Sequence, residues 1–236
     1  MKSEVGEFKW NKLKGARERF AACNMCRIAI EKARAGKLRV DVLIWDIQDS
    51  RHNVLGRDDI ANLQRMYYHL FINVLRRRWP NNAVWRLYPD EHTAVDWQTL
   101  EDFLEKKEFG LEEIVPATSA ERPLLQLADL FAGMAVFSRE KFQDYQAWLE
   151  APQSRLSGDT LDVDPSRSEK ERFNVLRYFD KICKARKLGV SLEKTQGLWT
   201  PKPKNPLNFW IYKPQHPDDK APTRGELRQK SSKKRS

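Results

Sequence analysis

The chain has 236 residues, a formal net charge of +10 and 40% hydrophobic residues, which is enough to build a buried core. No apolar run approaches the roughly 20 residues that cross a bilayer. The first residues are polar and basic, unlike a secretory leader, and three cysteines do not make a disulfide framework. These features argue against a membrane protein, a disulfide-rich secreted domain and a wholly disordered chain, and they predict a cytoplasmic protein.

The basic charge lies at the two ends of the chain. Residues 1–40 carry a net charge of +7 and residues 213–236 carry +5, whereas the stretch between them carries −2. Basic ends favour a polyanionic partner such as nucleic acid, because lysine and arginine neutralise phosphates. They are equally typical of solvated tails that keep a protein soluble. Residues 213–236 contain almost no apolar side chains, so we predict a disordered tail there.

Apolar residues at helical spacing alternate along the chain with short β-branched runs. In chain order, these patterns predict a helix over 11–36, a strand over 38–47, a helix over 58–78, a strand over 83–88, a helix over 97–109, a strand over 111–117, and helices over 124–149 and 169–187. The helix over 124–149 is the most apolar, and we expect a break near Ser138. Strands separated by helices indicate the α/β class.

The sequence predicts one domain over residues 1–212, followed by the basic tail. Residues 151–168 are rich in proline, serine, aspartate and glycine, which favours a flexible insertion within that domain. After Gly189 the chain is predicted to be extended, with an aromatic segment at 208–212.

Four acids occupy positions that call for an explanation: Glu7, Asp46, Asp90 and Asp129. Asp46 and Asp90 each follow a predicted strand, where α/β proteins collect their ligands, although aspartate is also common there as a turn residue. Asp129 lies in an apolar helix that we expect to be packed on all sides, so its carboxylate needs a partner. That partner is either a bound cation or a protein group that the carboxylate caps or pairs with, such as an arginine.

Taken together, the four acids predict a site for a hard cation. Mg²⁺ prefers carboxylate and water oxygens. Two such ions, about 3.5–4 Å apart, activate a water and stabilise the leaving oxygen of a phosphodiester. A nuclease of this kind needs three or four acids from different elements, which matches an acid-bearing centre between basic ends.

Three short motifs occur in a particular order along the chain: Glu7-Phe8-Lys9-Trp10, then Ser119 followed by Leu125-Gln126-Leu127-Ala128-Asp129-Leu130, then Asn208-Phe209-Trp210. With the strand that ends at Asp90, they resemble the motifs of the domain-of-unknown-function 3800 family. In that family a Glu-x-Lys-Trp motif, a strand-borne aspartate, a serine with a Leu-Gln-x-Ala-Asp-Leu helix, and an Asn-Phe-Trp motif follow one another. The resemblance covers about residues 5–212.

The resemblance implies a ribonuclease-H-like fold, with a mixed sheet flanked by helices, and a metal-dependent nuclease of bacteria, phages and mobile elements. Carried over to this chain, Glu7, Asp90 and Asp129 would be catalytic metal ligands, with Asp46 as a fourth ligand. The implied cofactor is Mg²⁺ or Mn²⁺, whose bound water attacks phosphorus, and the implied partner is nucleic acid. Lys9 would contact a phosphate or balance the charge of Glu7.

One family feature has no counterpart here. The family opens with a strand ending in Asp-Glu-Ser-Gly, but Met1 lies only six residues before Glu7. We therefore expect a sheet without its first strand, either because the start is internal or because this is a truncated copy. A truncated copy would have weak stability and little or no activity. The alternative function is a non-catalytic nucleic-acid- or protein-binding member of the same fold, made inert by loss of the first strand. The predicted partners besides nucleic acid are a protein or the missing N-terminal segment.

Two further features have both a functional and a structural interpretation. Arg76, Arg77 and Arg78 end a predicted helix, where cations interact favourably with the helix dipole, and they are also predicted to contact the nucleic-acid backbone. Cys23 and Cys26 form a C-x-x-C motif, but zinc needs four ligands and the chain has one other cysteine. We therefore predict that the two are buried helix cysteines.

Overall fold

The computed structural model describes residues 6–45, 58–76, 78–79, 82–91, 94–108, 110–151 and 165–212. The chain divides into two compact units. The first unit comprises Met1–Val42 and Thr118–Trp210, and the second comprises Leu43–Ala117 and Ile211–Ser236.

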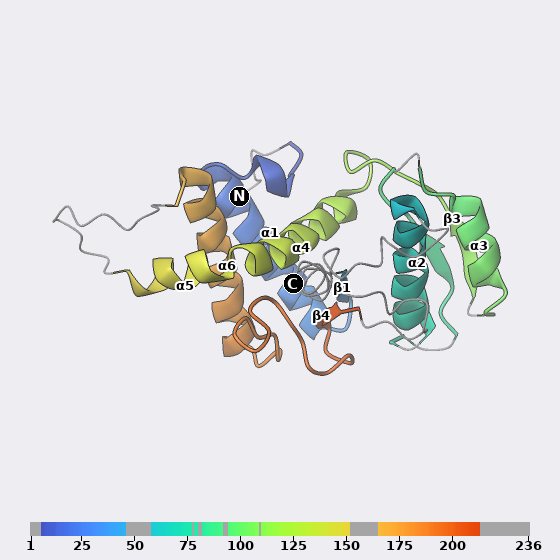
Figure 1. Ribbon diagram of the computed structural model, residues 1–236. Helices are drawn as coiled ribbons and strands as arrows, with labels where there is room; N and C mark the ends of the chain where they lie inside the picture. The colour runs from blue at the N-terminus through green and yellow to red at the C-terminus, as the bar shows by residue number, and fades with distance from the viewer. Residues whose placement is uncertain are drawn as a thin grey trace, which may run out of the picture. The chain divides into compact units, whose positions relative to one another are not determined.

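The first unit is largely helical. Its helices are η1 (Trp10–Lys12), α1 (Ala16–Arg34), α4 (Pro123–Glu140), α5 (Phe142–Glu150) and α6 (Arg167–Ala185) (Figure 1). Helix α1 packs along α6. The buried rings of Phe131, Phe179 and Phe209 meet edge to face, with pairs of centroids 5.6, 6.3 and 6.0 Å apart. This arrangement is a favourable one for aromatic rings, and the three rings are part of the buried core of the unit.

The second unit combines helices with a small parallel sheet (Figure 1). Its elements are α2 (Asp59–Phe71), the π-helix η3 (Ile72–Arg76), β2 (Trp85–Leu87), α3 (Trp97–Glu105) and β3 (Leu111–Ile114). Strands β2 and β3 pair in parallel, and α3 is the crossover that such a pair requires. The core of this unit is a cluster of four buried aliphatic residues: Leu75, Leu100, Leu104 and Ile114.

A second two-stranded sheet consists of β1 (Val40–Ile44) and β4 (Leu207–Ile211). The Val40 N–H donates to the Pro206 carbonyl at 2.9 Å, and the Tyr212 N–H donates to the Ile44 carbonyl at 2.8 Å. The chain passes from one unit to the other within each of these strands.

Side-chain caps determine where several helices begin. Asp96 Oδ1 accepts a hydrogen bond from the Thr99 N–H at 3.0 Å, and this bond lowers the pKa of Asp96. At the start of α6, Ser166 and Glu169 form a reciprocal capping box. The Ser166 hydroxyl, the Lys141 ammonium and the Ser166 N–H lower the pKa of Glu169 to about 2.

The predicted α/β class is confirmed, with differences at the ends of elements. The helix predicted over 11–36 begins at Ala16, because residues 10–12 form a 3₁₀ turn. The helix predicted over 124–149 is two helices that meet at Lys141, not near Ser138. Ser138 stays inside α4 because its hydroxyl donates to the Ala135 carbonyl and accepts from the Leu198 N–H.

The predicted insertion falls mostly on residues 152–164, and the predicted tail on 213–236, so both lie outside the described residues. Within the described ranges, none of the helices has the length and apolar character that a membrane span requires.

Candidate functional site

The candidate site lies in the first unit, where an extended segment at residues 7–10 contacts the first half of α4. Lys9 has extended backbone angles (φ −135°, ψ 130°), so successive side chains point in opposite directions. Phe8 and Trp10 are buried, with 3% and 8% of their surface exposed. The side chains of Glu7 and Lys9 keep 38% and 29% exposure. The alternation therefore anchors the segment through its aromatic residues and leaves one acid and one base accessible.

Two side chains of α4 bind the backbone of this segment. Gln126 Oε1 accepts the Phe8 N–H at 2.9 Å, and Asp129 Oδ2 accepts the Trp10 N–H at 2.6 Å. The N–H groups of alternate residues in an extended chain lie on one side, and helix positions three apart share a face. The two acceptors thus replace the carbonyl groups that a neighbouring strand would offer.

Ser119 joins the accessible acid and base. Its hydroxyl accepts from Lys9 Nζ at 2.7 Å and donates to Glu7 Oε1 at 2.5 Å, while Lys9 Nζ lies 3.3 Å from the same Glu7 oxygen. The Ser119 hydroxyl, and secondly Lys9, lower the pKa of Glu7, so this carboxylate is ionised at neutral pH. Ser119 itself is buried, and Gln126 Nε2 donates to its carbonyl at 2.9 Å.

Trp10 fits against α4 because position 133 is a glycine. A Cβ atom at Gly133 would lie 2.2 Å from Cγ of the Trp10 indole. The indole also meets the Phe137 ring edge to face at 5.8 Å, and the Arg172 guanidinium lies over it at 5.8 Å. These contacts hold the segment that carries Glu7 and Lys9 in place.

Three of the predicted site residues belong to these two segments: Glu7 and Lys9 contact each other, and Asp129 binds the Trp10 N–H in the same segment. Asp90 belongs to the second unit, where its side chain is exposed and its backbone pairs with Ala117 just beyond β2 and β3. Asp46 lies outside the described residues. The ligand roles predicted for Asp90 and Asp46 remain predictions.

The predicted arginine cluster also belongs to the second unit. Arg76 is the last residue of η3, and the Arg78 N–H donates to the Val74 carbonyl at 3.1 Å. Arg77 lies outside the described residues. Nucleic-acid contact by the three arginines stays a prediction.

The expectation that α4 is packed on all sides is wrong. Leu124 and Val136 are 70% and 53% exposed, and Ala128 and Ala132 are exposed between them. Positions four residues apart form one stripe of a helix, so this stripe faces away from the core of the first unit. Asp129 is partly buried, as expected, but its partner among the described residues is the Trp10 N–H, not an arginine.

The described residues contain no group of three or more His, Cys, Asp or Glu side chains that could hold a metal. However, Mg²⁺ is commonly held by one or two carboxylates and several waters. In the part of the chain that the structure describes, Glu7 Oε2 and Asp129 Oδ1 accept no hydrogen bond, because the bonds to these carboxylates use the other oxygens.

Sequence reasoning did not predict the buried acid at Asp41. Its side chain is 5% exposed and pairs with Arg39, whose Nε lies 3.2 Å from Oδ2. Asn208 Nδ2 donates to Asp41 Oδ1 at 3.0 Å. Asn208 of the Asn-Phe-Trp motif therefore contacts this pair. The sequence could have indicated this ion pair, because Arg39 and Asp41 are two positions apart in a predicted strand and such residues share one face.

The roles of Gln126 and Ser119 also had no signal of their own beyond the resemblance, since they depend on contacts with residues more than 100 positions away. The predicted burial of the C-x-x-C cysteines is confirmed for Cys26, whereas Cys23 is only partly buried. Cys26 and Cys183 are buried, and burial raises the pKa of both thiols and that of Cys23, the last to about 11.

Two curated proteins are similar to the chain over most of its length. Uncharacterized protein ORF2′ of Methanothermobacter thermautotrophicus is 46% identical over 230 residues, a match that covers 92% of this chain and 80% of the relative. Uncharacterized protein ORF2 of the same organism is 44% identical with the same coverage. No protein-family model and no solved structure matches the chain.

Proposed function

The chain belongs to the family of ORF2′ and ORF2 of Methanothermobacter thermautotrophicus, and we propose that this member is a metal-dependent nuclease. The observation that carries the proposal is the convergence of two distant segments in the first unit. Glu7 and Lys9 of the segment 7–10 contact Ser119, and the backbone N–H groups of Phe8 and Trp10 bind Gln126 and Asp129 of α4. These residues belong to two of the motifs through which the sequence resembles the domain-of-unknown-function 3800 family, and the contact between the two segments supports that resemblance.

Within the proposal, Glu7 Oε2 and Asp129 Oδ1 would hold a Mg²⁺ or Mn²⁺ ion. Such an ion, when bound, supplies a Lewis acid and a water of lowered pKa for attack on a phosphodiester. The neighbouring groups have separate tasks. Ser119 fixes the Glu7 carboxylate, and Lys9, which is 29% exposed, offers a cation to a phosphate.

The proposal includes a ribonuclease-H-like arrangement of the chain. Its support is the order of strands and helices and the parallel pairing of β2 and β3 across α3. A parallel pair with a helical crossover is a regular component of α/β folds.

One observation favours the second candidate, a non-catalytic nucleic-acid- or protein-binding protein. Both acids of the site have partners within the protein, since Glu7 pairs with Lys9 and Asp129 binds the Trp10 N–H. Their presence is therefore explained by folding alone, without an ion. The two candidates differ in whether a divalent cation binds here.

The test is binding of Mn²⁺ by titration calorimetry and by thermal unfolding. A ligand at 100 times its Kd stabilises a protein by about 2.7 kcal/mol, so binding should raise the Tm of the parent protein. We expect Glu7→Gln and Asp129→Asn to abolish that rise. The second change leaves an amide oxygen that still accepts the Trp10 N–H. The matched control is Glu105→Gln, which removes an exposed acid of α3 and should leave the response intact.

The same proteins should then be incubated with Mn²⁺ and end-labelled DNA, RNA and RNA–DNA hybrid. Cleavage by the parent and control, but not by the two site variants, is the expected result. If Mn²⁺ binds without cleavage, the nuclease assignment is wrong although the metal site stands. If Mn²⁺ does not bind the parent protein, the metal site is wrong as well and the binding function is preferred.

A further inference from the structure

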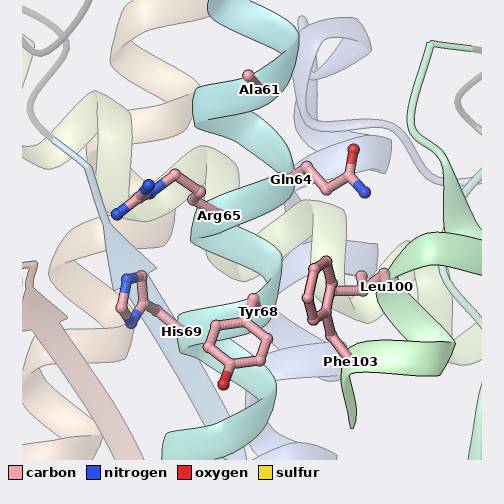
Figure 2. Close-up of a pocket in the computed structure, with 7 residues that line it drawn as sticks. All are labelled: Ala61, Gln64, Arg65, Tyr68, His69, Leu100 and Phe103. Carbon is pink, nitrogen blue, oxygen red and sulfur yellow. The ribbon is translucent and has the colours of Figure 1, made fainter. Parts of the chain in front are cut away.

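A groove of about 500 Å³ lies on the second unit, between helices α2 and α3. Figure 2 shows the side chains that line it, among them Arg65, Tyr68 and His69 of α2 and Phe103 of α3. The three α2 residues are three and four positions apart, so they occupy one face of that helix. Helix α3, on the other side of the groove, contributes Phe103 and the buried Leu100.

The groove combines aromatic surface with positive charge. Phe103 is 52% exposed, and its ring lies 6.4 Å from that of Tyr68 at an angle of 73°. Lys106 Nζ lies 5.5 Å from the centre of the Phe103 ring. None of the described residues that line the groove is acidic. An exposed aromatic face beside cations is complementary to a planar ring attached to an anion.

One residue of the groove lining, His69, contacts an aromatic residue from another part of the second unit. The Tyr212 hydroxyl and His69 Nε2 are 2.9 Å apart, and the two rings lie 4.8 Å from each other.

We propose that this groove binds single-stranded nucleic acid, with one base against Phe103 and Tyr68 and the adjoining phosphate near Arg65. A base inside a duplex does not offer its face to a side chain, whereas an unstacked base does. The volume lies within the roughly 300–1,000 Å³ of small-ligand sites. The groove would thus set the substrate class of the proposed nuclease. The inference rests on that function for its nucleic-acid partner, but it uses none of the residues of the Glu7–Asp129 site.

The test is fluorescence anisotropy of 5′-labelled dT₁₅ and of a 15-base-pair duplex, in EDTA so that no cleavage occurs. Removing an aromatic base platform weakens binding by on the order of tenfold, and we expect that loss for dT₁₅ with Phe103→Ala. Phe103→Leu, which keeps apolar bulk without an aromatic face, should show a similar loss. The matched control is Phe20→Ala, which removes a 66% exposed phenylalanine of α1 and should bind like the parent.

Arg65→Gln is expected to weaken binding and to flatten its salt dependence, because each neutralised phosphate contributes to the slope. Phe103 is largely exposed, so circular dichroism should show that the variants are folded. If Phe103→Ala does not fold, Phe103→Leu provides the binding measurement. The inference is overturned if both Phe103 variants bind dT₁₅ like the parent, or if the duplex binds as tightly. It is also overturned if Phe103→Ala abolishes a self-associated form seen by light scattering, which would assign the groove to a second copy.

The two proposals fail separately in these measurements. A protein that binds dT₁₅ through Phe103 but shows no Mn²⁺ response would retain the groove and lose the nuclease. A protein that cleaves but shows no Phe103 effect would retain the nuclease and lose the groove.

Discussion

At the scale of single residues, the site depends on two small residues, Ser119 and Gly133. Ser119 is small enough to be buried between Lys9 and Glu7 and still hydrogen-bond both. Gly133 leaves the space that the Trp10 indole fills. The charged groups of the site are thus positioned by neighbours that carry no charge.

Replacing Gly133 by alanine tests this packing. A Cβ 2.2 Å from Trp10 Cγ must displace the indole, and overpacking of this kind costs about 1–3 kcal/mol, partly offset by the better helix propensity of alanine. We expect a net loss of about 1–2 kcal/mol in urea unfolding. Gly6→Ala is the control, since nothing lies within 4 Å of its added Cβ. Equal stability of the two variants would contradict the role given to Gly133.

At the scale of elements, the start of α6 is determined by local sequence. Ser166 accepts the Glu169 N–H at 3.2 Å, and Glu169 accepts the Ser166 N–H at 2.9 Å. Lys141 pairs with Glu169 at 3.0 Å and so connects this helix start to the junction between α4 and α5.

Ser166→Ala should destabilise the protein by about 1 kcal/mol through loss of the cap. The pH dependence follows from the lowered pKa of Glu169, which is about 2 in the folded state. A lowered carboxyl pKa adds stability above the unfolded pKa of about 4.3, and that stability is lost as the pH falls toward 2. Unfolding of the parent and of Glu169→Gln should therefore differ at pH 6 and converge near pH 2. Lys181→Ala, at an exposed position of α6, is the control, and a pH-independent difference would contradict the assignment.

Features of the structure that depend on neighbouring residues could be predicted from the sequence, whereas those that depend on residues distant along the chain could not. The periodicity of apolar residues located each helix, because burial of one face is a local property of the pattern. It could not place the junction at Lys141, because Ser138 is held in the helix by the distant Leu198 N–H. The need of Asp129 for a partner was predictable from its apolar neighbours, but the Trp10 N–H was not, since it lies 119 positions away.

At the scale of the whole molecule, the described residues of each unit contain buried clusters of their own. Phe131, Phe179 and Phe209 pack together in the first unit, and Leu104 belongs to the aliphatic cluster of the second. A core of its own is what allows a unit to open without its neighbour.

Leu104→Ala should therefore act on one unit. The side chain is fully buried, and such a truncation costs about 2–5 kcal/mol. In native-state hydrogen exchange, we expect faster exchange in α2, α3 and the β2–β3 sheet, with α1 and α6 unchanged. Leu176→Ala in α6 is the matched truncation and should give the reverse pattern. Uniform acceleration across both units by either variant would show a single cooperative unit.

The bond between Asp129 and the Trp10 N–H has a consequence for how this family would evolve. A copy that lost all activity would still need an acceptor at position 129, so selection for folding would keep aspartate or asparagine there. Glu7, whose side chain is 38% exposed, makes no comparable hydrogen bond to the backbone, so substitutions at this position would accumulate in an inactive copy. Among related proteins, an aspartate or asparagine at position 129 would therefore indicate only that the protein folds. A glutamate at position 7 would indicate that selection still maintains the proposed metal-dependent activity.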